Sequence, residues 1–339
     1  MSVHLPVECI TECSRIQKQN NMLNYKKIIK SRRARVQFLK LFMWVPDKLM
    51  IRLQYRIKFG RRLNLENPER FTEKLQWYKL YYYNEYMTMC AGKNKVRDYV
   101  KMKGLESILN EQYGVYSKAD EIDFDSLPDK FVLKATVGSA SQQVLICTDK
   151  SKLDIGETRK RVDSWLSLYP NKKRMHSGRE WPYDGVKTEI IAEKYIDSSM
   201  CKEGLVSYKI FCFNGKPRFV YMIVDVKDGY FDADYGIYSP DFEKLPYNRV
   251  CEANLVPSTT KPDNWDEMIR IAETLSSEFP HVRVDLYNVE GKIIFGELTF
   301  FNDSGYMRYD PDEFDFIAGK MFTLPEKVRK PKDFRKIKG

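Results

Sequence analysis

The spacing of apolar and polar residues divides the 339-residue chain into a helical first part and a strand-rich second part. Between Lys26 and Tyr86, apolar residues recur at helical spacing with Lys and Arg between them. Residues 67–82 predict a helix with Thr72 near its cap, although Leu75 stands where a capping box would have Glu. A second helix is predicted over residues 92–104, ending near Gly104.

From residue 127 onwards the pattern is typical of strands. The stretch "LPDKFVLKATVGSAS" predicts a strand that runs into a loop of small residues, and "KTEIIAEKYI" predicts another strand. A hairpin is predicted around Asn214-Gly215 and a second one over residues 283–298, with helices from "RKRVDSWLSLYP" and "NWDEMIRIAETLSSEF". Helices first and a mixed, strand-rich body afterwards indicate the α+β class.

The second predicted hairpin, "RVDLYNVEGKIIFGEL", carries charges within strand-like sequence, where desolvation is costly. A three-residue loop over 289–291 would place Arg283 opposite Glu297 and bring Asp285 onto the same face. A two-residue loop would instead turn Glu297 to the opposite face. Two converging carboxylates suit a divalent cation such as Mg²⁺. The alternative is an Arg283–Glu297 ion pair on a hydrated face.

A lysine precedes the small-residue loop. Lys134 ends an apolar strand shortly before Gly138, and backbone N–H groups of such loops hold phosphates in many proteins. The established phosphate-loop motifs GxGxxG and GxxxxGK[ST] are absent, so an ordinary turn beside a surface lysine remains an equal interpretation.

The net charge of +10 is concentrated near the N-terminus. Residues 26–62 contain thirteen Lys or Arg and one acid, Asp47. An anionic membrane surface or nucleic acid would suit this segment, and a solvated helical face is the simpler alternative. We expect the membrane rather than nucleic acid.

Seven scattered cysteines without CxxC spacing and three histidines argue for a reducing compartment and against a zinc framework. The polar start and the interrupted apolar run near residues 36–53 predict neither a signal peptide nor a membrane span. The expected location is cytoplasmic, with the basic segment resting on the inner face of the membrane.

Several runs resemble the TupA-like branch of the ATP-grasp superfamily, which is associated with teichuronopeptide and bacterial surface-polysaccharide synthesis. They include "NPERFTEKLQWYKLY", "AGKNKVRDYV", "LPDKFVLKATVGSAS", "REWPYDG", "IIAEKYI" and "FPHVRVDLYNVEGKIIFGELTF", and the resemblance extends in order over residues 63–325. It implies two α+β subdomains that enclose ATP, at 127–196 and 197–325. These would follow a basic helical segment at 1–62 and a helical part at 63–126, with a basic tail at 326–339.

The resemblance also implies roles for individual residues. It makes Arg283 and Lys209 catalytic, with Lys209 near the terminal phosphate, and makes Asp285, Glu297 and Asn302 the candidate magnesium ligands. The residues that it implies for ATP binding are Lys93, Lys134, Gly138, Ser139, Ala140, Ser141, Glu193, Lys194, Ile196 and Lys209. Acceptor candidates are Arg179, Trp181 and Arg308.

Two departures from the family pattern affect these expectations. The loop 138–143 has fewer glycines than usual, which stiffens its backbone. Thr299 stands where many ATP-grasp sites have an asparagine, so Asn302 or Asp303 would have to complete the metal site. His176 is a weak candidate base, and His281 is expected to be structural.

The implied activity is ATP-dependent ligation, through an acylphosphate, of an amino acid or other amine to a uronic acid of a surface polysaccharide. The uronic acid would be part of a nucleotide sugar, a lipid-linked glycan or another precursor. Two alternatives stay open. A glycosyltransferase would use the "DAD" at residues 232–234, and a non-catalytic relative would have lost its ATP site.

Overall fold

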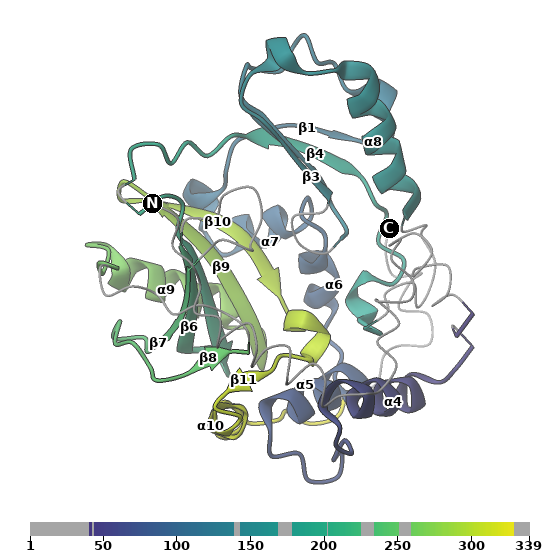
Figure 1. The fold of residues 1–339 in the computed structure, drawn as a ribbon, viewed down its shortest axis with the longest axis vertical. Coiled ribbons are helices and arrows are strands. Elements are labelled where there is room, and N and C mark those ends of the chain that lie inside the picture. Colours follow the sequence, from purple (N-terminus) through teal and green to yellow (C-terminus); the bar gives the residue numbers. More distant parts are fainter. Residues whose placement is uncertain are drawn as a thin grey trace, which may run out of the picture.

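The computed structural model describes residues 41–42, 44–138, 143–168, 178–201, 203–224, 234–250 and 259–328. Outside them lie the predictions on residues 26–40, Ser139, Ala140, Ser141, His176, Asp232, Ala233 and the tail from residue 329. The described residues form helices packed around antiparallel sheets, so the predicted α+β class is confirmed (Figure 1). The helices are α4 (Asp47–Phe59), α5 (Phe71–Tyr81), α6 (Glu85–Ala91), α7 (Val96–Met102), α8 (Ile155–Leu168), α9 (Trp265–Ser276) and α10 (Glu313–Met321).

A small sheet lies at the top of Figure 1, with α8 packed on it. Its four antiparallel strands have the order β1 (Gln112–Tyr116), β4 (Ile190–Lys194), β2 (Phe131–Ala135) and β3 (Val144–Cys147). Leu133 and Ala192 pair across the sheet and contribute to an apolar core with Val162 and Trp165 of α8. Burial of this apolar surface holds the small sheet to its helix.

A large antiparallel sheet forms the centre of the molecule. Its order is β10 (Lys292–Thr299), β9 (His281–Val289), β5 (Ser207–Phe213), β6 (Lys216–Val224) and β7 (Asp234–Tyr238). Both predicted hairpins are present, and each has positive φ at both turn residues: 52° and 74° at Asn214-Gly215, 49° and 81° at Glu290-Gly291. This geometry matches the right-handed twist of the flanking strands. The short strands β8 (Asn248–Arg249) and β11 (Tyr309–Asp310) pair separately.

The two faces of the large sheet differ in chemistry. One face, which includes Cys212, Val282 and Val284, is apolar and packs against α9, where the Cys212 thiol contacts the Ala272 carbonyl. Along the opposite face the residues change from aromatic to charged. Phe213 and His281 lie among aromatic rings at one end, and two residues further along β9 the side chains become charged. Strand alternation separates the apolar core from this charged face.

The first turn of α5 is held by Glu73. Its carboxylate accepts the N–H groups of Asn64, Glu69 and Arg70 at 3.2–3.3 Å. The helix therefore begins one residue before Thr72, with Arg70 at the N-cap, two residues from the predicted neighbourhood at Thr72. Glu73 stands three residues after Arg70, which is the capping-box spacing, but Arg is not a usual cap residue and gives little signal in sequence.

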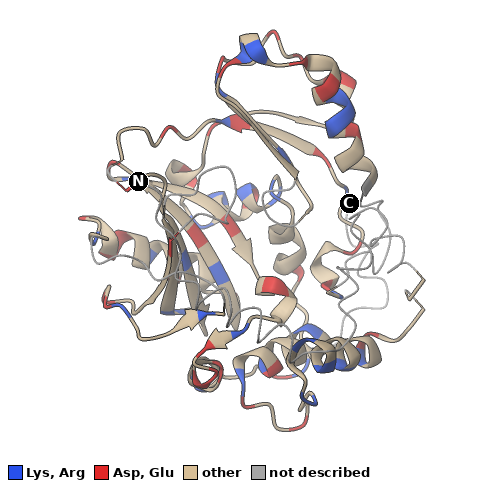
Figure 2. Cartoon of the chain, viewed as in Figure 1, with Lys and Arg blue, Asp and Glu red and all other residues tan. Residues whose placement is uncertain are grey.

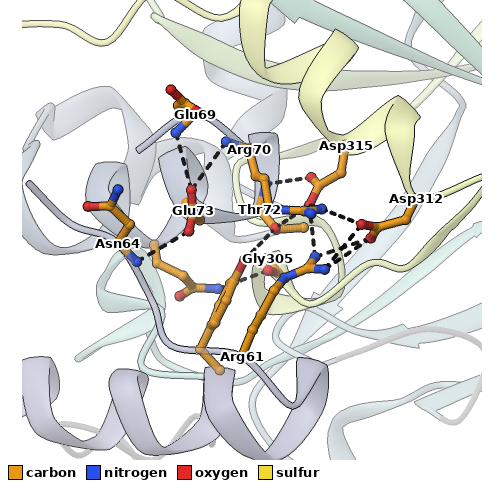
Figure 3. Close-up of polar contacts among 11 residues, drawn as sticks. Arg61, Asn64, Glu69, Arg70, Thr72, Glu73, Gly305, Asp312 and Asp315 are labelled. Carbon is orange, nitrogen blue, oxygen red and sulfur yellow. Dashed lines mark hydrogen bonds and ion pairs between the residues drawn. The ribbon is translucent and has the colours of Figure 1, made fainter. Parts of the chain in front are cut away.

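Thr72 instead contacts α10. Its N–H and Oγ1 donate to the two carboxylate oxygens of Asp315 at 2.9 and 2.7 Å, and Arg61 and Arg70 reach Asp315 and the neighbouring Asp312 (Figure 3). Burial raises the pKa of Asp315, and the Thr72 hydrogen bonds and the two arginines oppose that shift. The network joins the segment after α4 to α5 and to the last described helix.

His281 begins β9 and is fully buried beside Phe71 and Phe213, as expected for a structural histidine. Its Nδ1 lies 3.0 Å from the Cys212 carbonyl, which can only accept, so Nδ1 carries a proton. Burial lowers the pKa of His281 to about 3, with a smaller contribution from Arg283, while the hydrogen bond to Cys212 opposes the shift.

This histidine predicts a pH-dependent stability. Between about pH 6.5 and pH 3 the unfolded chain binds the extra proton and the folded chain does not, so stability falls as the pH falls through this window. The loss from His281 is roughly 1 kcal/mol per pH unit. His281→Asn retains an N–H for the Cys212 carbonyl but cannot titrate. Urea unfolding between pH 7 and pH 5 should show a shallower pH dependence for this variant, and equal slopes would contradict the prediction.

Candidate active site

Four charged side chains meet on the face of the large sheet opposite α9. They come from three adjacent strands: Lys209 from β5, Arg283 and Asp285 from β9, and Glu297 from β10. Lys209 and Asp285 are paired across the strands, and charged residues of both signs colour the middle of β9 and β10 in Figure 2. The predicted one-face arrangement of Arg283, Asp285 and Glu297 is therefore present.

The charges form a continuous network. Arg283 donates from Nε and Nη2 to the two carboxylate oxygens of Asp285, both at 2.6 Å, and from Nη2 to Glu297 Oε1 at 2.9 Å. Lys209 Nζ donates to Asp285 Oδ2 at 2.7 Å. Lys209, Arg283 and Asp285 are all buried, so these ion pairs offset the cost of removing their charges from water.

The register that creates this network differs from the predicted one. The turn has two residues, Glu290 and Gly291, so Lys292 pairs with Val289. The predicted strand register, with Arg283 directly opposite Glu297, is therefore wrong: Arg283 lies opposite Thr299 and reaches Glu297 only through its side chain. A two-residue turn alone would send Glu297 to the apolar face. A β-bulge between Phe295 and Glu297 inserts one additional residue and returns Glu297 to the charged face, opposite Asp285.

Gly296 is the additional residue of the bulge, and its lack of a side chain has a local cause. A Cβ atom at this position would lie 3.0 Å from the Asp285 carbonyl oxygen and 3.3 Å from the Asp285 Cβ. Glycine therefore lets β10 approach the backbone of the residue that holds both Lys209 and Arg283.

The small sheet supplies a second group of charges. Lys134 on β2 and Glu193 on β4 form an ion pair at 2.8 Å. Lys93, between α6 and α7, is held against the end of β2, where its N–H donates to the Thr136 carbonyl at 3.2 Å. Lys93 interacts electrostatically with Lys134 and Glu193 of the small sheet and with Glu297 of the large sheet. The two predicted phosphate-binding lysines, Lys93 and Lys134, therefore lie near the charged face of the large sheet.

The pKa shifts record this convergence. Burial lowers the pKa of Lys93, Glu297 raises it and Lys134 lowers it further. Burial also acts to raise the pKa of Glu297, but Arg283, Lys93 and Lys209 together lower it to about 2. Glu297 is therefore ionised throughout the neutral range, and its side chain is 41% exposed, so a ligand can reach it.

The remaining predicted ATP residues lie around this group. Gly138 precedes the undescribed part of the small-residue loop with φ 154°, and a Cβ there would meet the Gln143 side chain at 2.5 Å. Lys194 ends β4, is exposed and pairs with Glu111 at 3.3 Å. Ile196 follows the strand and is partly buried. Lys194 and Ile196 continue from Glu193, so they lie on the small-sheet side of the charges.

The two candidate magnesium carboxylates differ in how many of their oxygens already accept hydrogen bonds: one oxygen of Glu297 and both oxygens of Asp285. Glu297 is ionised and partly exposed, and Thr299 Oγ1 donates to its Oε1 at 3.1 Å. Both oxygens of Asp285 already accept from Arg283, and one also accepts from Lys209. The amide nitrogen of Asn302 points to Met307 Sδ. Among the described residues, no group of three His, Cys, Asp or Glu is arranged to hold a metal.

The three acceptor candidates do not gather at the network. Arg179 is buried and donates to the Phe42 and Val45 carbonyls and to Asp47 at the start of α4, at 2.6–3.2 Å. Trp181 is buried against Tyr83, with ring centroids 4.9 Å apart, and Arg308 is exposed beside β11. Arg179 and Trp181 are thus packed against the start of α4 and against Tyr83, and their contact with an acceptor stays a prediction.

The same segment contains two further polar residues: Glu180, which belongs to the predicted acceptor run 179–181, and Tyr183, which no sequence pattern singled out. Tyr183 is close enough to the network that, after burial, the carboxylates of Glu180 and Glu297 raise its pKa and Arg283 lowers it. Burial raises the pKa of Glu180, which is opposed by Lys79 and by a hydrogen bond from Ser304. Alternation within "REWPY" separates Glu180 from its neighbours Arg179 and Trp181, but Tyr183 lies in a 3-10 turn, Trp181–Tyr183, where no strand alternation could have indicated its direction.

Lys79 supports this segment from beneath. Its Nζ donates to Gln76 Oε1, to the Gly178 carbonyl and to the Ser304 carbonyl at 2.8–3.0 Å. Burial lowers the pKa of Lys79 to about 8, although Glu180 raises it. The buried Lys79 ammonium thus connects Gly178, at the start of the segment 178–183, with Ser304 in the turn that follows β10.

Two antiparallel sheets with lysines on one side and an Arg, Asp and Glu network on the other define the class of protein as ATP-grasp. The chain belongs to the TupA-like ATP-grasp family, because the model described as "TupA-like ATPgrasp" matches residues 73–323. The comparison with curated proteins gives no match.

Solved ATP-grasp structures are similar to parts of the chain. D-alanine–D-alanine ligase from Bacillus anthracis complexed with ATP is 17% identical over 62% of this chain and 55% of its own, with a TM-score of 0.37. L-amino acid ligase from Bacillus licheniformis is 14% identical over 85% and 64%, with a TM-score of 0.48. N5-carboxyaminoimidazole synthetase from Staphylococcus aureus complexed with ADP is 12% identical over 71% and 54%, with a TM-score of 0.40. The chain thus spans less than two thirds of the length of each of these three proteins.

The bulge gives a specific prediction. In Gly296→Ala the new methyl group must displace the β9 backbone at Asp285 by a few tenths of an ångström, which disturbs Lys209 and Arg283 together. We expect nucleotide-dependent ADP release to fall about tenfold or more, because small displacements of charged groups are costly at such sites.

Gly291→Ala is the matched control. A Cβ at Gly291 would meet no neighbour, but φ is 81°, so this variant should lose about 1 kcal/mol of stability while its activity stays intact. Equal losses of activity in the two variants at a temperature where both are folded would contradict the assigned role of the bulge.

Proposed function

We propose that this protein is an ATP-dependent carboxylate–amine ligase that releases ADP. The observation that carries this proposal is the convergence of Lys134 from the small sheet and Lys93 from the segment between α6 and α7 with the Lys209, Arg283 and Glu297 network of the large sheet. Four cationic side chains around Asp285, Glu193 and Glu297 provide the charge that a polyphosphate needs. Family membership supports the same interpretation.

In the free protein the cations and carboxylates neutralise one another. We infer that binding of ATP exchanges these partners: Lys93, Lys134 and Lys209 turn to phosphate oxygens, and Asp285 and Glu297 become available to a magnesium ion. The ion, when bound, would neutralise phosphate charge and orient the terminal phosphoryl group. Asp285 and Glu297 exchange cationic side chains for the magnesium ion, and the lysines exchange carboxylates for phosphate oxygens, which limits the cost of the exchange to the loss of the Lys134–Glu193 ion pair.

The proposed chemistry has two transfers. A substrate carboxylate oxygen attacks the γ-phosphorus, the bond to the β-phosphate oxygen breaks, and an acylphosphate and ADP result. An amine then attacks the acyl carbon, phosphate leaves and an amide forms. Arg283, which donates to both Asp285 and Glu297 in the free protein, offsets the negative charge of the tetrahedral intermediate. No protein nucleophile is required.

We propose that the carboxylate belongs to a uronic acid of a bacterial surface polysaccharide or its precursor, and that an amino acid or similar amine attacks it. The resemblance to the surface-polysaccharide branch supports this substrate class. Glu180 offers a carboxylate to an ammonium group, and Tyr183, whose pKa is raised by burial and by the charges of Glu180 and Glu297, offers a hydroxyl. The proposed location is the cytoplasm, where ATP and activated sugars are available.

The ligase proposal is tested at Glu297. Glu297→Gln keeps the shape of the side chain but removes the charge that faces Lys93 and Arg283, so ADP release with Mg²⁺, amines and uronic acids should fall at least about a hundredfold. Glu290→Gln, an exposed residue of the same hairpin, should behave as the wild type.

Thermal stabilisation distinguishes the alternatives. Stabilisation by ATP with Mg²⁺ and not by UDP-sugars agrees with the ligase. Stabilisation by UDP-sugars alone would favour a glycosyltransferase, and no response to either ligand would leave only a non-catalytic relative. Full ADP release by Glu297→Gln would remove the proposed role of this carboxylate.

The acceptor side is tested at Tyr183. Tyr183→Phe should raise the KM for the uronic acid or amine several-fold, by about 1 kcal/mol of lost hydrogen bonding, and leave the KM for ATP unchanged. Tyr113→Phe on β1 is the control. A change confined to the KM for ATP would place Tyr183 at the nucleotide instead.

A further inference from the structure

The outward face of α4 carries two parallel rows of different chemistry. Leu49, Leu53 and Ile57 recur every four residues and are 57%, 55% and 36% exposed. One position before each stands an exposed basic residue: Lys48, Arg52 and Arg56. Residues four apart lie on the same side of a helix, so an apolar row runs beside a basic row along the whole element.

The inner face of α4 is already used. Ile51 and Tyr55 are fully buried, and the Tyr55 hydroxyl lies 3.0 Å from Thr72 Oγ1. Arg179 binds Asp47 and the carbonyl groups before the helix, and Arg61 pairs with Asp312 and Asp315 just after it. The helix is thus fixed to the body near both ends (Figure 1), and the side chains of the two rows remain exposed.

We propose that this face of α4 binds the surface of an anionic lipid bilayer. The apolar row would enter the region between headgroups and acyl chains, while Lys48, Arg52 and Arg56 contact lipid phosphates. The only acid of α4, Asp47, is paired with Arg179 and does not oppose this attraction. Leu41 and Trp44, 65% and 78% exposed just before the helix, add apolar surface.

A bilayer fits both rows better than other occupants do. Nucleic acid would contact the basic row through its phosphates, but the three exposed aliphatic side chains of the apolar row would remain in water. A second copy of the chain would bring two positively charged faces together, because a two-fold interface uses the same patch of both copies. None of the helices in the described part of the chain is long and apolar enough to cross a membrane, so the proposed binding is at the surface.

The position of α4 connects the membrane to the acceptor side. Arg179 holds the start of α4, and the next residue, Glu180, lies near Tyr183 and the Lys79 ammonium. A lipid-linked acceptor would therefore meet the protein close to the segment that carries these groups. The membrane proposal does not depend on ligase activity, because α4 shares none of its outward residues with the charged network.

The test is vesicle flotation of the full chain with phosphatidylcholine vesicles, with and without phosphatidylglycerol, at low and high salt. The wild type should float with the anionic vesicles, and high salt or neutral vesicles should weaken this binding. Leu49→Ser/Leu53→Ser/Ile57→Ser and Lys48→Glu/Arg52→Glu/Arg56→Glu should each reduce binding about tenfold or more.

Matched controls use exposed residues elsewhere. Ile146→Ser/Met200→Ser removes apolar side chains that are 62% and 79% exposed, and Lys216→Glu/Arg218→Glu reverses two exposed charges. Both should bind as the wild type, and all variants should retain their melting temperature and ATP-induced stabilisation.

Three results would overturn the proposal: no flotation of the wild type, equal binding to neutral vesicles, or unchanged binding of the apolar-row variant. Sedimentation velocity without lipid gives a fourth. If the wild type self-associates and the apolar-row variant does not, the face is an interface between copies.

Discussion

The bidentate ion pair between Arg283 and Asp285 is the contact on which the candidate site depends. Both residues are buried in the middle of a sheet, where an unpaired charge would cost several kcal/mol. Each therefore requires the other, and Lys209 and Glu297 extend the pair to the neighbouring strands. A site that binds ATP needs charges held in place before the nucleotide arrives, and this network supplies them in neutralised form.

The sheet provides the network by using its two faces differently. The apolar face buries Val282 and Val284 against α9 and supplies the stability of the strands. The other face can then carry charges without weakening the core, because alternate residues of each strand point away from it. Gly296 is where the two requirements meet, since Phe295 belongs to the apolar face and Glu297 to the charged one. In a regular strand, residues two apart share a face, so the bulge at Gly296 is what places Phe295 and Glu297 on opposite faces.

The segment 178–183 has a similar double use. Arg179 and Trp181 point into the body and connect it to α4 and Tyr83, whereas Glu180 and Tyr183 lie towards the charged network. Buried Lys79 holds the beginning of this segment beside the turn that follows β10. The segment 178–183, the turn after β10 and the basic helix α4 are thus connected through two buried cations, Lys79 and Arg179.

The sequence by itself determined the class of the fold, both hairpins and the identity of the charged residues. Those features follow from local chemistry: alternation marks a strand, Asn-Gly marks a turn, and the family resemblance rests on runs of adjacent residues. Tertiary structure decided the register of β10, the cap of α5 and the direction of each side chain between Arg179 and Tyr183. The bulge depends on how closely Gly296 approaches the Asp285 backbone, and the cap depends on Glu73 reaching three N–H groups at once. Contacts between residues distant in sequence are set by packing of the whole chain, so no local pattern specifies them.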